Sequence, residues 1–256
     1  MPLAPGSTSS CQRGSMAMAA LLSRFCSSRS AAAALLRGRG GLSASPSLRC
    51  STEEQRYLSS GLVGLPGEGG WQSPPSPTSL DKVVKLETFA GQTKEYIAKT
   101  WLKFHEDERE GRVGWVLSRS EFKQLQQNAQ ESPIFVVPLE KPEGYVTLVL
   151  QWQMQHPQSK LGLITTLEEF QKDSLSANSH FTLTHYTELA RKDLVLVRGD
   201  VASAKLINAF EARMLTKRVY EHYLDPEKYA RWVKTFNHAS RQFDFKAYIK
   251  ELGFLA

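Results

Sequence analysis

The chain has 256 residues, of which 32 are lysine or arginine and 26 are aspartate or glutamate, and its formal net charge is +6. The excess positive charge comes from the first 52 residues, which contain six arginines, no lysine and no acidic residue. Removing those arginines leaves 26 basic and 26 acidic residues. The basic pI of 9.2 is therefore no argument that the folded part binds nucleic acid.

The N-terminal segment has the composition of an organelle transit peptide, which is rich in arginine and serine and lacks acidic residues. The run Arg56-Tyr57-Leu58-Ser59-Ser60 resembles a mitochondrial processing site with cleavage after Leu58, and Arg49-Cys50-Ser51 is a second candidate. A plastid transit peptide shares the serine content, but the arginine spacing and the end of the segment favour mitochondria. The sequence therefore predicts a mitochondrial transit peptide over 1–58 and a location in the mitochondrial matrix.

All three cysteines, Cys11, Cys26 and Cys50, lie in this segment. A mature chain without them has no disulfide, zinc ribbon, iron–sulfur cluster or thiol nucleophile. No later apolar run approaches the ~20 residues of a membrane-spanning helix. We therefore expect no cofactor, no metal site and no membrane insertion, and a chain that is monomeric when free.

Composition divides the rest of the chain into two parts. Residues 59–79 are dominated by glycine, proline and serine, which is typical of a flexible linker. Residues 80–256 amount to one domain, long enough to bury a core by itself.

The foldable part shows helical and strand patterns in alternation. Thr93 and Ser203 are expected N-caps, Asp225-Pro226 and Asp244 mark the starts of the last two helices, and Gly253 marks the end. Connections between the last five strands are too short for crossover helices, so most pairs should be antiparallel. We predict an α+β fold, with a single mostly antiparallel β-sheet of about six strands flanked by N- and C-terminal helices. The expected helices cover 94–108, 120–130, 204–223, 226–236 and 245–252, and the expected strands cover 111–117, 133–138, 145–152, 161–170, 181–189 and 194–197.

The sequence has none of the common catalytic motifs: no P-loop, dinucleotide-binding glycine motif, nucleophile elbow or paired metal-binding histidines. The most enzyme-like stretch is Thr184-His185-Tyr186-Thr187-Glu188. On a strand, the odd spacing sends His185 and Glu188 to opposite faces, so we expect no catalytic residue. The alternative function is an organellar enzyme whose site combines His185 with Glu188 or Asp200.

Three charged features have ordinary structural interpretations. The acidic run at 106–110 is expected at the solvated end of a helix rather than in a cation site. Arg198-Gly199-Asp200 is expected to be a strand-to-helix turn that uses glycine for its backbone freedom. Glu211 and Glu221 dilute the basic side of the 204–223 helix, so no nucleic-acid partner is expected.

From Leu80 onwards, the order and spacing of short motifs resemble one known family. The strongest stretch is Leu183-Thr184-His185-Tyr186-Thr187-Glu188-Leu189, followed by Asp193-Leu194-Val195-Leu196-Val197-Arg198-Gly199-Asp200. Over about 175 residues, the chain resembles the mitochondrial F1-ATPase assembly factor 1 family, which chaperones the β subunit of the F1 sector of ATP synthase. The other matching motifs are Leu80 to Glu87, Ile97 to Trp101, Phe135 to Leu139, Gly144 to Thr147, Glu211-Ala212, Phe236-Asn237 and Phe243 to Lys246.

The resemblance implies a non-catalytic molecular chaperone that binds the unassembled β subunit and prevents its aggregation until the α subunit replaces it. Residues 80–256 would form this β-binding domain. Exposed apolar surface on an unassembled subunit promotes aggregation, so a chaperone must cover it reversibly. For Phe210 and Met214 the alternative is ordinary helix-on-sheet core, the more frequent position of such residues. The candidate contact residues are Tyr186, Thr187, Glu188, Phe210 and Met214.

Overall fold

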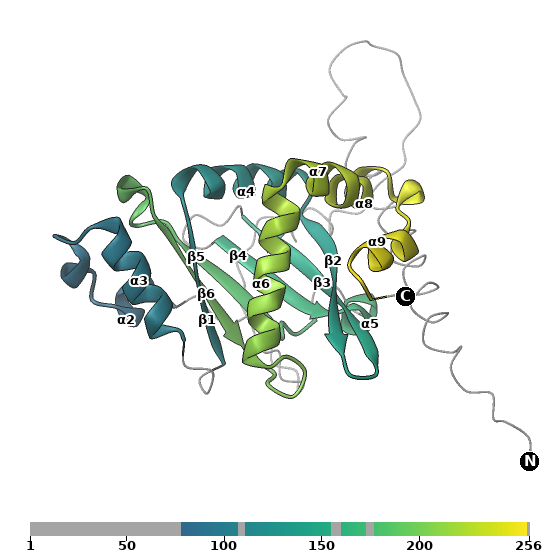
Figure 1. Ribbon diagram of the computed structural model, residues 1–256, viewed down its shortest axis with the longest axis horizontal. Coiled ribbons are helices and arrows are strands. Elements are labelled where there is room, and N and C mark those ends of the chain that lie inside the picture. Colours follow the sequence, from purple (N-terminus) through teal and green to yellow (C-terminus); the bar gives the residue numbers. More distant parts are fainter. Residues whose placement is uncertain (1–77, 107–110, 155–159, 173–176, 255–256) are drawn as a thin grey trace, which may run out of the picture.

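The computed structural model describes residues 78–106, 111–154, 160–172 and 177–254. It contains a six-stranded sheet in the order β1-β6-β5-β4-β3-β2, with all five neighbouring pairs antiparallel (Figure 1). The predicted α+β class and mostly antiparallel sheet are confirmed. The strands are β1 (Arg112–Leu117), β2 (Ile134–Lys141), β3 (Gly144–Gln153), β4 (Lys160–Thr166), β5 (Phe181–Tyr186) and β6 (Val195–Val201).

Several sequence predictions concern residues outside the described part of the chain. They are the transit peptide at 1–58 with its three cysteines, the linker up to residue 77, and the acidic residues within 107–110.

Strand order follows chain order for most of the sheet. Strands β2 to β6 are neighbours in turn, because their short connections do not allow a crossover. β1 comes first in the chain but pairs with β6, so β1 and β2 form the two edges of the sheet.

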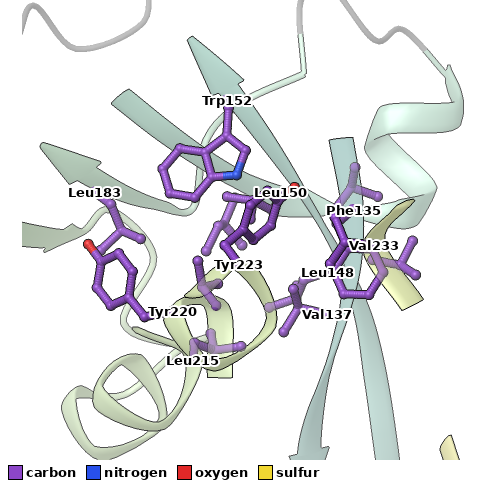
Figure 2. Close-up of a cluster of buried hydrophobic side chains, with 14 of the residues drawn as sticks. Phe135, Val137, Leu148, Leu150, Trp152, Leu183, Leu215, Tyr220, Tyr223 and Val233 are labelled. Carbon is purple, nitrogen blue, oxygen red and sulfur yellow. The ribbon is translucent and has the colours of Figure 1, made fainter. Parts of the chain in front are cut away.

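One face of the sheet is covered by the long helix α6 (Ala209–Leu224), which lies across the strands (Figure 1). The rings of Tyr220 and Tyr223 are directed from α6 toward the strands (Figure 2), and Tyr223 packs edge-on against Trp152 with ring centroids 5.4 Å apart. Both residues belong to the main core. The other helices that contribute to this core are α4 (Arg119–Glu131), α5 (Leu167–Lys172), the π-helical turn η4 (Tyr229–Lys234), α8 (Thr235–His238) and α9 (Phe245–Glu251). The short helix α7 (Pro226–Lys228) precedes η4, and the 3-10 turn η5 (Ser240–Gln242) lies before α9.

The opposite face carries a second, smaller apolar cluster. Val195 and Val197 belong to the main core, whereas Leu196 belongs to the second cluster, as the alternation of side chains along a strand requires. Trp101 of α3 (Lys94–Phe104) packs in the second cluster, and its indole N–H donates to Val197 O at 3.0 Å. Tyr186 of β5 lies in the same cluster. The remaining short helices are α2 (Leu80–Val83), η1 (Leu86–Phe89) and η3 (Ala190–Lys192).

The predicted helix starts are correct at three positions and wrong at one. Thr93, Asp225 and Asp244 each accept hydrogen bonds from backbone N–H groups of the first turn that follows them. Ser203 does not cap the long helix. Asn208 is the cap instead, because it forms a reciprocal capping box with Glu211 that satisfies two backbone N–H groups.

Several element boundaries differ from the prediction. The strand expected over 161–170 ends at Thr166, whose hydroxyl accepts from the Glu169 N–H and so starts α5. The strand expected over 181–189 ends at Tyr186, and the first helix ends at Phe104 rather than at residue 108.

Pro138 lies within β2, not at its end as the sequence suggested. Proline is tolerated there because β2 is an edge strand and the missing N–H would point away from the sheet. On this outward side, the Asn237 amide donates to Ile134 O at 2.6 Å, the Tyr248 hydroxyl donates to Val136 O at 3.4 Å, and Arg218 donates to Pro138 O. The outer edge of β2 is therefore closed by side chains from the C-terminal helices.

Arg198-Gly199-Asp200 is also not the turn that we predicted. The three residues continue β6 to Val201, and both the Nε and Nη2 groups of Arg198 donate to Asp200. Glycine is required at 199 for space rather than for backbone freedom. A Cβ atom there would lie 2.6 Å from the ring carbons of Phe181.

We expect Gly199→Ala to lower the free energy of unfolding by about 1–3 kcal/mol, the usual cost of overpacking a core. Gly91→Ala is the matched control, since nothing lies within 4 Å of a Cβ at that position. Urea denaturation of both variants measures the difference. Equal stabilities would contradict the steric role of Gly199.

Candidate functional site

The structure does not bring His185 and Glu188 together. His185 lies in β5 and is 4% exposed, and its Nδ1 lies 2.9 Å from Lys160 O and its Nε2 3.0 Å from the Tyr220 hydroxyl. Because a carbonyl only accepts, Nδ1 carries the proton and Nε2 accepts from Tyr220. Glu188 lies beyond the end of the strand and is exposed. Both ring nitrogens of His185 are thus occupied by structural hydrogen bonds.

Burial keeps His185 neutral. It lowers the pKa of His185 from 6.5 to about 4, although the hydrogen bond with the Lys160 backbone acts in the opposite direction. Burial is also the main cause of the lowered pKa values of His105 and His222. These histidines are core side chains whose charging opposes folding.

The polar clusters elsewhere do not form a metal site. His180 Nε2 and Glu169 Oε2 make a half-buried pair that joins α5 to the start of β5. Within the described ranges, no group of three or more His, Cys, Asp or Glu side chains is placed to hold a metal ion. Among the same residues, no helix is long and apolar enough to cross a membrane.

The five predicted contact residues fall into two separate groups. Tyr186 is 5% exposed, and its hydroxyl donates to Thr78 O at 2.9 Å. Thr187 and Glu188 follow it at the surface, at the end of β5. Phe210 and Met214 belong to α6, on the other side of the sheet. The predicted set is therefore not one continuous surface.

Phe210 and Met214 are at the surface, so the core alternative is wrong for both. Phe210 is 63% exposed and Met214 is 40% exposed, and they lie one helical turn apart. Lys217 and Glu221 continue the same stripe and form an ion pair at 3.8 Å. We call these four residues the α6 ridge. Tyr220, on another side of the helix, faces the core.

The N-terminal end of the α6 ridge is held firmly by the sheet. Lys141 of β2 donates to Glu211 at 2.7 Å and to Leu206 O at 2.6 Å. Both ionic side chains are largely buried, so this pair is less screened by solvent than a surface pair. Together with the capping box at Asn208, the Lys141–Glu211 ion pair fixes the position of the first turn of α6, which carries Phe210.

Sequence reasoning missed a second apolar surface, on α3. Tyr96, Leu102 and Phe104 are 54%, 45% and 53% exposed. Phe104 borders a half-open hollow of about 250 Å³ between α3 and η1. The amphipathic pattern predicted that this segment is helical, but it did not predict how wide the buried stripe of the helix is. The buried stripe includes Ile97, Trp101 and His105. The hollow is lined by Val84, Lys85, Thr88, Phe89, Thr100, Trp101 and Phe104.

The segment before α3 is bonded to a lysine of η3, the turn between β5 and β6. Lys192 Nζ donates to Phe89 O at 2.8 Å and to Ala90 O and Gln92 O at 2.9 Å each. Asp193, in the left-handed region at φ 59°, accepts from the Arg119 N–H at 3.1 Å. All the large exposed hydrophobic side chains of the described part therefore lie on two anchored helices, α3 and α6.

An antiparallel α+β domain that exposes large apolar side chains on two helices has features of a protein-binding domain. The sequence profile of the ATP11 protein family matches residues 50–249, and the chain belongs to this family.

Three curated relatives carry the name ATP synthase mitochondrial F1 complex assembly factor 1. The protein of Danio rerio is 28% identical over 191 residues, which cover 74% of this chain and 60% of the relative. The proteins of Mus musculus and Homo sapiens are each 27% identical over 176 residues, which cover 68% of this chain and 52% and 51% of the relatives. The chain thus spans between about half and three fifths of the length of these relatives.

The depressed pKa of His185 predicts a loss of stability in acid. The unfolded chain binds a proton near pH 6.5, whereas the folded chain does so only near pH 4. Stability is therefore fully present above pH 6.5 and falls as the pH drops toward 4, by about 3 kcal/mol in total from this residue. We expect His185→Gln to reduce the difference in unfolding free energy between pH 7 and pH 5 by about 2 kcal/mol.

Urea denaturation at the two pH values measures this effect. His238→Gln, at an exposed histidine, is the matched control. An equal change in both variants would show that the buried imidazole is not responsible.

Proposed function

We propose that this protein is a mitochondrial assembly factor for the F1 sector of ATP synthase, and that it acts as a chaperone of the unassembled β subunit. The names of the curated relatives support the assembly role. The resemblance of the motifs around β5 and β6 supports the choice of the β subunit. The α subunit would then displace the chaperone during assembly.

The observation that carries the proposal is the exposure of large apolar side chains on ordered helices. Phe210, Met214, Tyr96, Leu102 and Phe104 are each at least 40% exposed. A side chain that is ordered before binding loses little conformational entropy when it is covered, so such residues are efficient contact points. Aromatic residues and methionine are also enriched in protein interfaces. A non-catalytic binding role accounts for these features.

The enzyme alternative has no comparable support. His185 is buried with both nitrogens bonded, and Asp200 lies on the side of the sheet that faces α3, where it pairs with Arg198. We therefore propose no catalytic role for His185, Glu188 or Asp200.

The domain assignment is part of the proposal. Residues 1–58 would direct the chain to the mitochondrial matrix, 59–79 would be a linker, and 80–256 would bind the β subunit. The acid-free composition of the N-terminal segment supports import.

The proposal predicts that one molar equivalent of the protein slows the aggregation of isolated F1 β subunit without ATP. The physical reason is that the chaperone covers apolar surface that otherwise self-associates. Light scattering at a temperature where the β subunit alone aggregates measures the rate. An unchanged rate would count against the chaperone role.

For contact with the β subunit, we propose two separate surfaces on opposite sides of the sheet, namely the α6 ridge and the end of β5 at Tyr186, Thr187 and Glu188. The double variant Phe210→Asp and Met214→Asp should weaken binding to the β subunit at least about tenfold, because charges replace apolar contacts on the α6 ridge. Gln127→Asp on the exposed side of α4 is the control. Titration calorimetry measures the affinities. Unchanged affinity in the double variant would exclude the α6 ridge.

A further inference from the structure

The two edge strands of the sheet differ in whether their outward backbone groups are hydrogen-bonded. The outer carbonyls of β2 are bonded to Asn237, Tyr248 and Arg218, and Pro138 removes one outer N–H. Natural sheets protect their edges by such devices, because an open row of N–H and C=O groups is a template for another strand. β1 forms the other edge, and its outward N–H and C=O groups can be compared with those of β2.

The register shows which backbone groups of β1 face outward. The Val201 N–H donates to Gly111 O, so these two residues form a hydrogen-bonded pair of the β1–β6 ladder. In an antiparallel ladder such pairs recur every second residue. Val113 and Trp115 therefore bond to β6, whereas the N–H and C=O groups of Gly114 and Val116 point away from the sheet.

Nothing in the described ranges pairs with those outward groups. No described backbone or side-chain group is hydrogen-bonded to Gly114 or Val116 from outside the sheet. Both residues are partly exposed, and β1 lies between α3 and α6 (Figure 1). From Val113 to Leu117 the strand contains no proline and no charged residue that would discourage pairing.

We propose that the outer edge of β1 binds an extended strand of the client, which adds to the sheet as a seventh strand. The inference rests on the proposed function, in which the client is the F1 β subunit. The occupant must be extended polypeptide, because only a strand presents C=O and N–H groups at the spacing of Gly114 and Val116. β1 is about 20 Å long, so the paired segment has up to about six residues.

The side chains beside this edge define the class of segment that fits. Trp115 is partly exposed on the side of α6, where its ring packs on Tyr220 with centroids 5.7 Å apart. Val116 points to the side of α3 and packs on the second cluster. A client strand with apolar residues opposite both positions gains cross-strand contacts as well as backbone hydrogen bonds.

Amide hydrogen exchange of the full-length chain, resolved by NMR with and without isolated F1 β subunit, tests the inference. The amides of Gly114 and Val116 should exchange rapidly in the free chain and at least about tenfold more slowly in the complex. The amides of Val113 and Trp115 are internal controls that should be slow in both states.

Three other outcomes would overturn the inference. If the β subunit binds and the Gly114 and Val116 amides stay fast, the edge is not used, although the proposed function stands. If the β subunit does not bind at all, the proposed function fails first. If both amides become protected when the concentration of the chain alone is raised, the occupant is a second copy rather than the client.

A pair of variants gives an independent measure. Val116→Pro removes the outward N–H, whereas Val116→Ala removes two methyl groups of the side chain and keeps that N–H. We expect the proline variant to bind the β subunit at least about tenfold more weakly than the alanine variant, with both folded by circular dichroism. Equal affinities would contradict strand addition. If the proline variant does not fold, the exchange measurement decides.

Discussion

The contact between α6 and the sheet organises most of the molecule. Tyr220 and Tyr223 carry large rings into the core, and their hydroxyls are satisfied by His185 Nε2 and Ser132 O. A buried hydroxyl without a partner costs on the order of 1–3 kcal/mol, so these bonds resist rotation of the helix about its axis. One side of α6 is therefore committed to the core, and the opposite side, with Phe210 and Met214, is left in solvent.

A comparable restraint acts on the other face of the sheet. Trp101 bonds to Val197 O and Lys192 holds three carbonyls of the segment before α3, so this helix also has one orientation. Both apolar surfaces are in place before any partner arrives. In the proposed chaperone role, surfaces that are already ordered lose little conformational entropy when a partner covers them.

Local sequence signals predicted the features that depend on neighbours in the chain. Short connections implied antiparallel strands, and Thr93 and Asp244 were correctly identified as caps. The wrong predictions concern a choice between two possible caps and a contact between residues far apart in the chain. Asn208, and not Ser203, caps α6. Gly199 is needed because the ring of Phe181, on the neighbouring strand, fills the space that a Cβ atom would occupy. For the candidate site, the sequence singled out Phe210 and Met214 of α6, which are exposed, but not the exposed apolar side chains of α3.

By itself, the sequence determined the fold class, the strand count and a family resemblance, because these follow from periodicity, turn residues and the order of motifs. The tertiary structure alone decided which apolar residues are exposed and which sheet edge is open. Periodicity defines the stripe of a helix but not how deeply the stripe is covered. The closing of β2 depends on Arg218 and Asn237, which lie 80 and 103 residues away from the carbonyls that they bind. No local pattern contains such a pairing.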